Sequence, residues 1–183
     1  MEDLLRYCRD RAFYAYGTHR LFARRAYRLK IRRDVLTYLG VAAPITVGGV
    51  ILSFGLESAY VPYIISLAAI VNVLQLAASV WAIVADWSQR HVYANSAAQN
   101  NILLFNKWDT LCKTQPSDLA YRVELLRVDD QRQEELDTAQ HIGDKEKRFA
   151  MRASLLQFGL RCETCRNKVI TMKPSGCDTC GNF

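Results

Sequence analysis

The sequence predicts an all-α membrane protein with a two-helix transmembrane hairpin, a cytoplasmic helical bundle and a small C-terminal zinc ribbon. Three observations predict this class: two long uncharged runs lie back to back, charge-rich helical patterns surround them, and two CxxC pairs stand near the C-terminus. They divide the chain into a basic amphipathic N-terminal helix (1–34), the hairpin (35–87), a cytoplasmic helical region (88–157) and the ribbon (158–183).

The two apolar runs are each long enough to cross a bilayer. Residues 35–56 contain no charged side chain over 22 positions, and residues 61–85 contain none over 25 positions. About 20 helical residues span the hydrocarbon core of about 30 Å. Only residues 57–60 separate the runs, which predicts antiparallel neighbours. The alternative, two core helices of a soluble protein, fits two adjacent uncharged runs of this length less well.

Basic residues flank the hairpin on one side only. Seven Lys and Arg residues lie between positions 20 and 33, residues 57–60 contain none, and Arg90 follows the second run. Cytoplasmic flanks of membrane helices carry an excess of Lys and Arg. The pattern therefore predicts that both termini are cytoplasmic.

Polar side chains within the runs are candidates for a pore lining or a helix-packing face. The second run carries Asn72, Gln75 and Ser79 at helical spacing, and the first carries Thr46 and Ser53. An unpaired amide in hydrocarbon is costly, so both amides should face other helices or water. Two interpretations stay open: these side chains bond helices together, or they line a polar path.

A polar path would need several copies of the chain, because two helices cannot enclose one. We therefore expect a homo-oligomer, a tetramer or larger. Asp86 follows the second run at its cytoplasmic end. It is either an ordinary interfacial acid or one member of a carboxylate ring at a pore mouth.

The N-terminal 34 residues combine ten Lys and Arg residues with four acids and interleaved aromatic side chains. This composition fits a helix that touches anionic lipid headgroups. It equally fits a patch for a nucleotide or single-stranded nucleic acid, with aromatic side chains stacked on bases. The candidate ligand-binding residues, with those of the equally basic ribbon, are Arg24, Arg25, Arg28, Arg161, Arg166 and Lys168.

The cytoplasmic region predicts three further helices, over 88–115, 118–140 and 145–157. The first break is the stretch 115–118, where Ser117 or Asp118 is suited to cap the helix that follows.

The C-terminal cysteines predict a structural zinc site. Cys162 and Cys165 are followed by eleven residues and then by Cys177 and Cys180, a spacing typical of two turns that share one tetrahedral metal. We expect Gly181 to adopt the left-handed conformation after its turn, and residues 169–172 to form a short strand. Four thiolates leave no open coordination position. No nucleophile, acid–base pair or phosphate loop stands out elsewhere, so we expect no enzymatic activity.

The spacing CxxC-x11-CxxC, ending in CGNF, resembles the bacterial family of mobilome CxxCx(11)CxxC proteins. The run 19–27 before the first span, with the two spans and the later helices, resembles the SLATT domain of bacterial conflict systems. The resemblance implies a bacterial inner-membrane channel that depolarises infected cells in antiviral defence, that is, abortive infection. In the Hailong system a channel of this type is controlled by an oligodeoxyadenylate from a neighbouring nucleotidyltransferase.

Two functions are therefore open. The first is an oligomeric ion channel gated by a nucleotide or single-stranded oligonucleotide that a neighbouring nucleotidyltransferase makes. The second is a membrane-anchored adaptor whose zinc ribbon binds a protein or nucleic acid.

Overall fold

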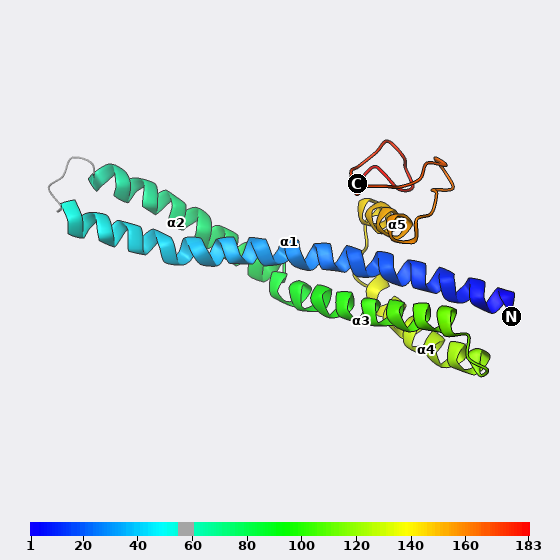
Figure 1. The fold of residues 1–183 in the computed structure, drawn as a ribbon. Coiled ribbons are helices and arrows are strands. Elements are labelled where there is room, and N and C mark those ends of the chain that lie inside the picture. The colour runs from blue at the N-terminus through cyan, green and yellow to red at the C-terminus, as the bar shows by residue number, and fades with distance from the viewer. Residues whose placement is uncertain (55–60) are drawn as a thin grey trace. The chain divides into compact units, whose positions relative to one another are not determined.

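The computed structural model describes residues 1–54 and 61–183. These ranges contain five helices (Figure 1): α1 (Glu2–Phe54), α2 (Val61–Val84), α3 (Trp87–Thr114), α4 (Leu119–Thr138) and α5 (Asp144–Phe158). The predicted all-α class is confirmed. The strand expected at 169–172 is wrong, since the described ranges hold only an isolated antiparallel bridge between Arg161 and Lys168. The predicted turn at 57–60 lies outside the described residues.

The chain divides into two compact units. The helical unit contains residues 1–25 and 93–183, and the hairpin unit contains residues 26–92. Helix α1 contributes to both, because no glycine or proline interrupts it between Gly17 and Gly40. The change from basic to apolar sequence that we placed at residue 34 is therefore a change of composition within one helix.

The core of the helical unit lies where the first part of α1 packs on α3 and α4. Its centre is Trp108, which is fully buried and meets Tyr7 edge-to-face with ring centroids 5.8 Å apart. The buried positions of α4 recur at spacings of four and three, the pattern of a helix packed along one stripe. They are Leu119, Val123, Leu126, Asp130, Gln133 and Asp137.

The second half of that α4 stripe is polar, and hydrogen bonds satisfy it. The Asp130 carboxylate accepts bonds from Arg11 Nε at 2.5 Å and Trp108 Nε1 at 3.1 Å. Asp137 accepts bonds from Tyr93 at 2.7 Å, Asn101 at 2.7 Å and Gln133 at 2.8 Å. Burial raises the pKa of the Asp137 carboxyl above its ordinary value.

The start of α4 differs from the expected capping. Asp118 occupies the N-cap position, but its side chain makes no capping hydrogen bond. Its carboxylate instead accepts a bond from Arg122 Nε at 2.8 Å, one turn later. An arginine at that distance competes successfully with the backbone amides for the carboxylate.

Helix α5 packs closely against α1 at Gly17. A Cβ added to Gly17 would lie 2.7 Å from Ser154 Oγ and 3.0 Å from the Ala150 carbonyl oxygen. The Ser154 hydroxyl donates to the Phe13 carbonyl at 2.7 Å, and Arg25 Nε donates to Glu146 at 2.5 Å. Gly159, at φ 64°, ends α5 and turns the chain into the cysteine-bearing segment.

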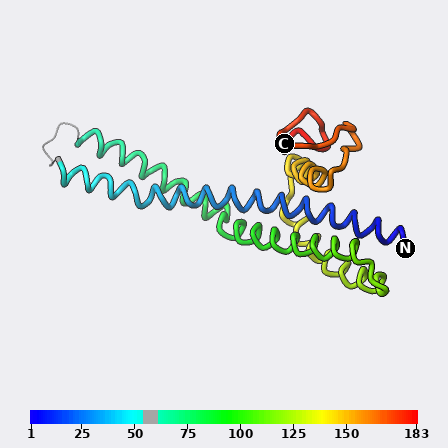
Figure 2. Tube along the Cα trace, viewed as in Figure 1, coloured from blue at the N-terminus to red at the C-terminus, as the bar shows by residue number. Residues whose placement is uncertain are grey.

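The hairpin unit contains the second part of α1, α2 and the start of α3, and its α1 and α2 segments run alongside each other in the Cα trace (Figure 2). Both helices are long and apolar enough to cross a membrane by length and composition, and their apolar windows are not buried within the chain. The half-buried residues of α2 recur at spacings of three and four, as in a helix seam. They are Ile64, Ala68, Val71, Gln75, Ala78, Ser79 and Ala82.

The seam of the hairpin unit is narrow at Gly40. A Cβ added to Gly40 would lie 2.6 Å from Gln75 Nε2, so the amide of Gln75 occupies the space that the missing side chain leaves. Small residues at this contact allow the two helix backbones to approach closely.

Candidate metal centre and hairpin polar residues

The four C-terminal cysteines converge on one point. Their Sγ atoms all lie within 4.8 Å of one another, and the pairs Cys162–Cys177 and Cys165–Cys180 are each 3.9 Å apart. In a tetrahedral site with metal–sulfur bonds of about 2.3 Å, the sulfurs are about 3.8 Å apart. All four cysteines are free of disulfides. The predicted group that can hold a metal ion is therefore confirmed, and its four sulfur donors are those that zinc takes in structural sites.

The two CxxC turns are related by a shift of fifteen residues. Cys162 faces Cys177, Cys165 faces Cys180, and the Thr164 hydroxyl lies 2.7 Å from the Thr179 hydroxyl. In each turn, the carbonyl of the first cysteine accepts a backbone bond from the residue four positions later, at 2.7 and 2.8 Å. The near-twofold arrangement presents two sulfurs from each side of the site.

The residue after the second turn differs from our expectation. Arg166 adopts the left-handed conformation with φ 57°, whereas Gly181 is absent from the positive-φ residues of the described chain. A Cβ at Gly181 would collide with the backbone and the side chain of Ser175. The glycine is needed for close approach, not for a left-handed turn.

Backbone hydrogen bonds favour the thiolate form of Cys177, the form that binds a metal. Hydrogen bonds from the N–H groups of Thr179 and Cys180 lower the pKa of the Cys177 thiol to about 7. Burial has the opposite effect on Cys180, whose pKa it raises. Metal ligation requires the thiolate form of each cysteine.

The cysteine segment is seated on α5 by Arg152, a residue that sequence reasoning missed. Arg152 Nε donates to the Thr171 carbonyl at 2.8 Å, and Nη1 lies 3.2 Å from the Cys180 carbonyl oxygen and 3.3 Å from Ser175 Oγ. The available signal is its position, because Phe149 and Leu156 place Arg152 on the apolar face of its helix.

The polar residues of the hairpin differ in exposure. Gln75 is half-buried against Gly40, and Ser79 is also half-buried, whereas Asn72 is exposed. Thr46 and Ser53 of the first span are exposed as well, and the Thr46 hydroxyl donates to the Ala42 carbonyl at 2.8 Å. The two amides that we grouped together thus differ: one fills the internal seam and the other faces outward.

Asp86 lies in the short turn between α2 and α3. Its φ of 52° is left-handed, a conformation that Asp and Asn adopt more readily than most residues. Its carbonyl accepts the N–H of Arg90 at 3.0 Å, and its side chain is exposed. The residue therefore ends one helix and starts the next, while its carboxylate stays available to solvent.

The predicted ligand-binding residues are spread over both units. Arg24 stacks on Phe149, with its guanidinium carbon 4.2 Å from the ring centroid, and Arg25 is paired with Glu146. Arg28 belongs to the hairpin unit and is exposed. The remaining three, Arg161, Arg166 and Lys168, are exposed on the cysteine segment.

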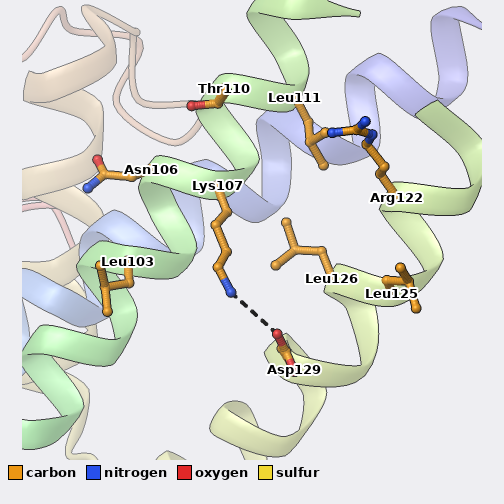
Figure 3. A pocket seen from close by; sticks show the side chains of 9 residues that line it. All are labelled: Leu103, Asn106, Lys107, Thr110, Leu111, Arg122, Leu125, Leu126 and Asp129. Carbon is orange, nitrogen blue, oxygen red and sulfur yellow. Dashed lines mark hydrogen bonds and ion pairs between the residues drawn. The ribbon is translucent and has the colours of Figure 1, made fainter. Parts of the chain in front are cut away.

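An open groove runs between α3 and α4 of the helical unit (Figure 3). It has a volume of about 530 Å³, and its apolar side chains include Leu103, Leu111, Leu125 and Leu126. Lys107 reaches across it toward Asp129, with 3.4 Å between nitrogen and oxygen (Figure 3). None of the predicted ligand-binding residues lines this groove.

A comparison with known protein families shows which family the chain belongs to. Residues 6–183 match the family described as Mobilome CxxCx(11)CxxC protein. The chain belongs to this family. The match covers the hairpin as well as the cysteines, so the family is defined over both units. Neither the curated proteins nor the solved structures gave a match to the chain.

Proposed function

We propose that this family member is an oligomeric ion channel in the bacterial inner membrane, a pore-forming effector of anti-phage abortive infection. In this proposal both termini are cytoplasmic, and a nucleotide or single-stranded oligonucleotide from a neighbouring nucleotidyltransferase gates the pore. The chain binds and responds and has no catalytic residues. The observation that carries the proposal is the outward-facing amide of Asn72 on an apolar hairpin.

The exposed apolar surface of the hairpin supports its insertion in a bilayer. Leu52, Ile83 and Tyr63 are 89%, 79% and 77% exposed, although each lies on a helix long enough to span a membrane. Large contiguous apolar surface on a chain marks a contact with lipid or with another protein. Two helices satisfy all their backbone hydrogen bonds internally, as a membrane span requires.

The basic end of the hairpin unit supports lipid headgroups as a partner. Arg28, Lys30, Arg32 and Arg33 are exposed along less than two turns of α1. The Arg32 guanidinium lies 5.6 Å from the ring centroid of Trp87. Tryptophan beside arginine is typical of the membrane interface, where the ring sits at the headgroup level and the cation meets phosphate.

Asn72 supports assembly of several copies. The seam between α1 and α2 is already filled by Gln75 over Gly40, and none of the hydrogen bonds among the described residues reaches Asn72. An unpaired amide facing lipid is costly, so Asn72 should meet a polar group of another copy or water in a pore. Thr46 and Ser53 are exposed and can extend that polar surface.

The metal group is assigned to structural zinc in this proposal. Four sulfur ligands close a tetrahedral site and leave no position for a reactive water. Its contribution is the folding energy of the C-terminal segment, which has few buried residues. They are Cys162, Val169, Cys180 and Gly181, and the first three pack with Leu155 of α5.

Liposome reconstitution of the full chain tests the channel. Ion flux is measured without ligand and with oligodeoxyadenylate as the probe, for the wild type, Asn72→Leu and Gln75→Leu. We expect wild-type flux in one of the two states and a severalfold change in Asn72→Leu, with Asn72→Gln as the conservative control. Gln75→Leu should mainly weaken the hairpin. Absence of flux in both ligand states contradicts the channel.

The adaptor is the second candidate, favoured by the surface of the cysteine segment. Arg161, Arg166 and Lys168 are exposed there, and Ile170 is 76% exposed. Replacing residues 35–85 with an unrelated two-span hairpin separates the two functions. Retained defence against phage favours the adaptor, and lost defence with retained zinc content favours the channel.

A further inference from the structure

Arg152 carries a buried positive charge with only neutral acceptors around it. The residue is 9% exposed, and its guanidinium meets the carbonyls of Thr171 and Cys180 and the hydroxyl of Ser175. Among the described residues, no carboxylate lies within ion-pair distance of it. A buried cation without a counter-ion is strongly unfavourable, so an anion is expected nearby.

The metal centre is the anion that the geometry offers. Arg152 Nη1 lies 4.0 Å from the Sγ atom of Cys180, one of the four convergent cysteines. One divalent ion with four thiolates carries a net double negative charge. Hydrogen bonds and charges from the surrounding shell hold ligands in place and tune the affinity of a metal site.

We propose that Arg152 is the counter-ion of the metal-loaded cysteine cluster and that metal loading seats the cysteine segment on α5. With metal bound, the guanidinium compensates the negative charge of the cluster. With metal absent and the thiols protonated, the same guanidinium is buried beside neutral groups. The segment should then leave α5 so that Arg152 can reach water.

The contact between the cysteine segment and α5 extends to α1. Ser154, two residues after Arg152, donates to the Phe13 carbonyl, and Phe13 also packs against the cluster that contains Cys162 and Cys180. Metal loading should therefore hold the region around Gly17 of α1 as well as α5. Zinc affinity and amide hydrogen exchange do not depend on the proposed channel, so their results are independent of the ion-flux experiment.

Three variants of the full chain in detergent test the counter-ion. Arg152→Met removes the charge at similar length, Arg152→Lys keeps the charge, and Arg148→Met removes a neighbouring arginine that donates to the Asn182 carbonyl at 3.1 Å. Zinc affinity is measured by competition with a chromogenic chelator. We expect a loss of about 10–100-fold for Arg152→Met, as for other residues that support metal ligands. Arg152→Lys should retain most of the affinity, and Arg148→Met should stay close to wild type.

Amide hydrogen exchange tests the seating. Stripping zinc from the wild type should raise exchange in α5 and in residues 10–20, and zinc-loaded Arg152→Met should resemble the stripped wild type there. Wild-type zinc affinity in Arg152→Met overturns the proposal. So does an equal loss in Arg152→Lys, which would show that shape and not charge matters. If Arg152→Met does not fold, Arg152→Gln, which keeps side-chain hydrogen-bond donors but no charge, takes its place with the same expected loss of zinc affinity.

Discussion

The two units of the molecule differ in whether their polar side chains are hydrogen-bonded within the chain. In the helical unit, the carboxylates of Asp130 and Asp137 are buried, and each accepts at least two hydrogen bonds from neighbouring helices. In the hairpin unit, Asn72 and Ser53 are exposed on otherwise apolar helices. The helical unit thus satisfies its polar groups within one chain, whereas the hairpin presents polar groups that need something outside it. In the proposed assembly, further copies of the chain meet the exposed polar groups of the hairpin.

The largest expected effect is loss of the metal. Cys180→Ser removes a buried ligand and should lower the zinc content from one ion per chain to nearly none, because three sulfurs do not complete the site. Metal analysis of the purified chain measures this content. Cys112→Ser is the matched control, since Cys112 lies outside the metal group. Full zinc content in Cys180→Ser would contradict the assigned ligand set.

The next largest effect tests whether the buried polar side chains of α4 stabilise the helical unit. Asp130→Ala leaves Arg11 without its buried partner and Trp108 Nε1 without an acceptor. We expect a loss of about 3 kcal/mol in the free energy of unfolding, as when one partner of a buried pair is removed. Thermal unfolding of the detergent-solubilised chain measures it.

The control for that substitution is Asp129→Ala, which breaks the exposed pair with Lys107. An exposed pair contributes roughly 0–1 kcal/mol, so the control should unfold near the wild-type temperature. Equal effects of the two substitutions would mean that the buried polar stripe of α4 does not hold the unit together.

A smaller effect should locate the seam of the hairpin. Gly40→Leu adds a side chain where Gln75 Nε2 already lies, whereas Gly49 has nothing within 4 Å of a built Cβ. We expect Gly40→Leu to destabilise the chain by about 1–3 kcal/mol through overpacking. Gly49→Leu should be close to neutral within one hairpin, so a loss of stability there alone would place the seam on the other face of α1.

The smallest effect is a pH dependence at Asp137. Its folded-state pKa is raised by burial, so ionisation costs more in the folded chain than in the unfolded chain, whose carboxyl titrates near pH 3.9. Its contribution to stability is therefore fully present below the unfolded pKa and is lost as the pH rises toward the folded pKa. Relative to Asp137→Asn, the wild type should gain unfolding temperature as the pH falls from 7 toward 4, because the folded chain holds the proton more tightly than the unfolded chain over that range. A constant difference would contradict the raised pKa.

Features set by local spacing could be predicted from the sequence, and features set by tertiary contact could not. The interval between Cys165 and Cys177 was enough to predict four convergent sulfurs, because each CxxC turn orients its own pair. The capping of α4 failed because Arg122 takes the carboxylate of Asp118. The left-handed conformation expected for Gly181 is wrong. A glycine is required there because Ser175 approaches its backbone closely, a tertiary contact that the sequence of the turn does not reveal.

Asn72 and Gln75 illustrate the same limit in the hairpin. Three residues apart on a helix, they lie on the same side and looked equivalent in one helix taken alone. The position of Gly40 on α1 decides which amide enters the seam, and that is a property of the packed pair. Arg152 was missed for a similar reason, because its role depends on a segment that returns to α5 from beyond Gly159.

The mass and projection image of the detergent-solubilised full chain test the central claim most directly, namely that the hairpin is complete only in an assembly. We predict a symmetric particle of at least four copies with a central opening, and a change in copy number or opening in Asn72→Leu. A monodisperse monomer that keeps its zinc and its helical fold would contradict it.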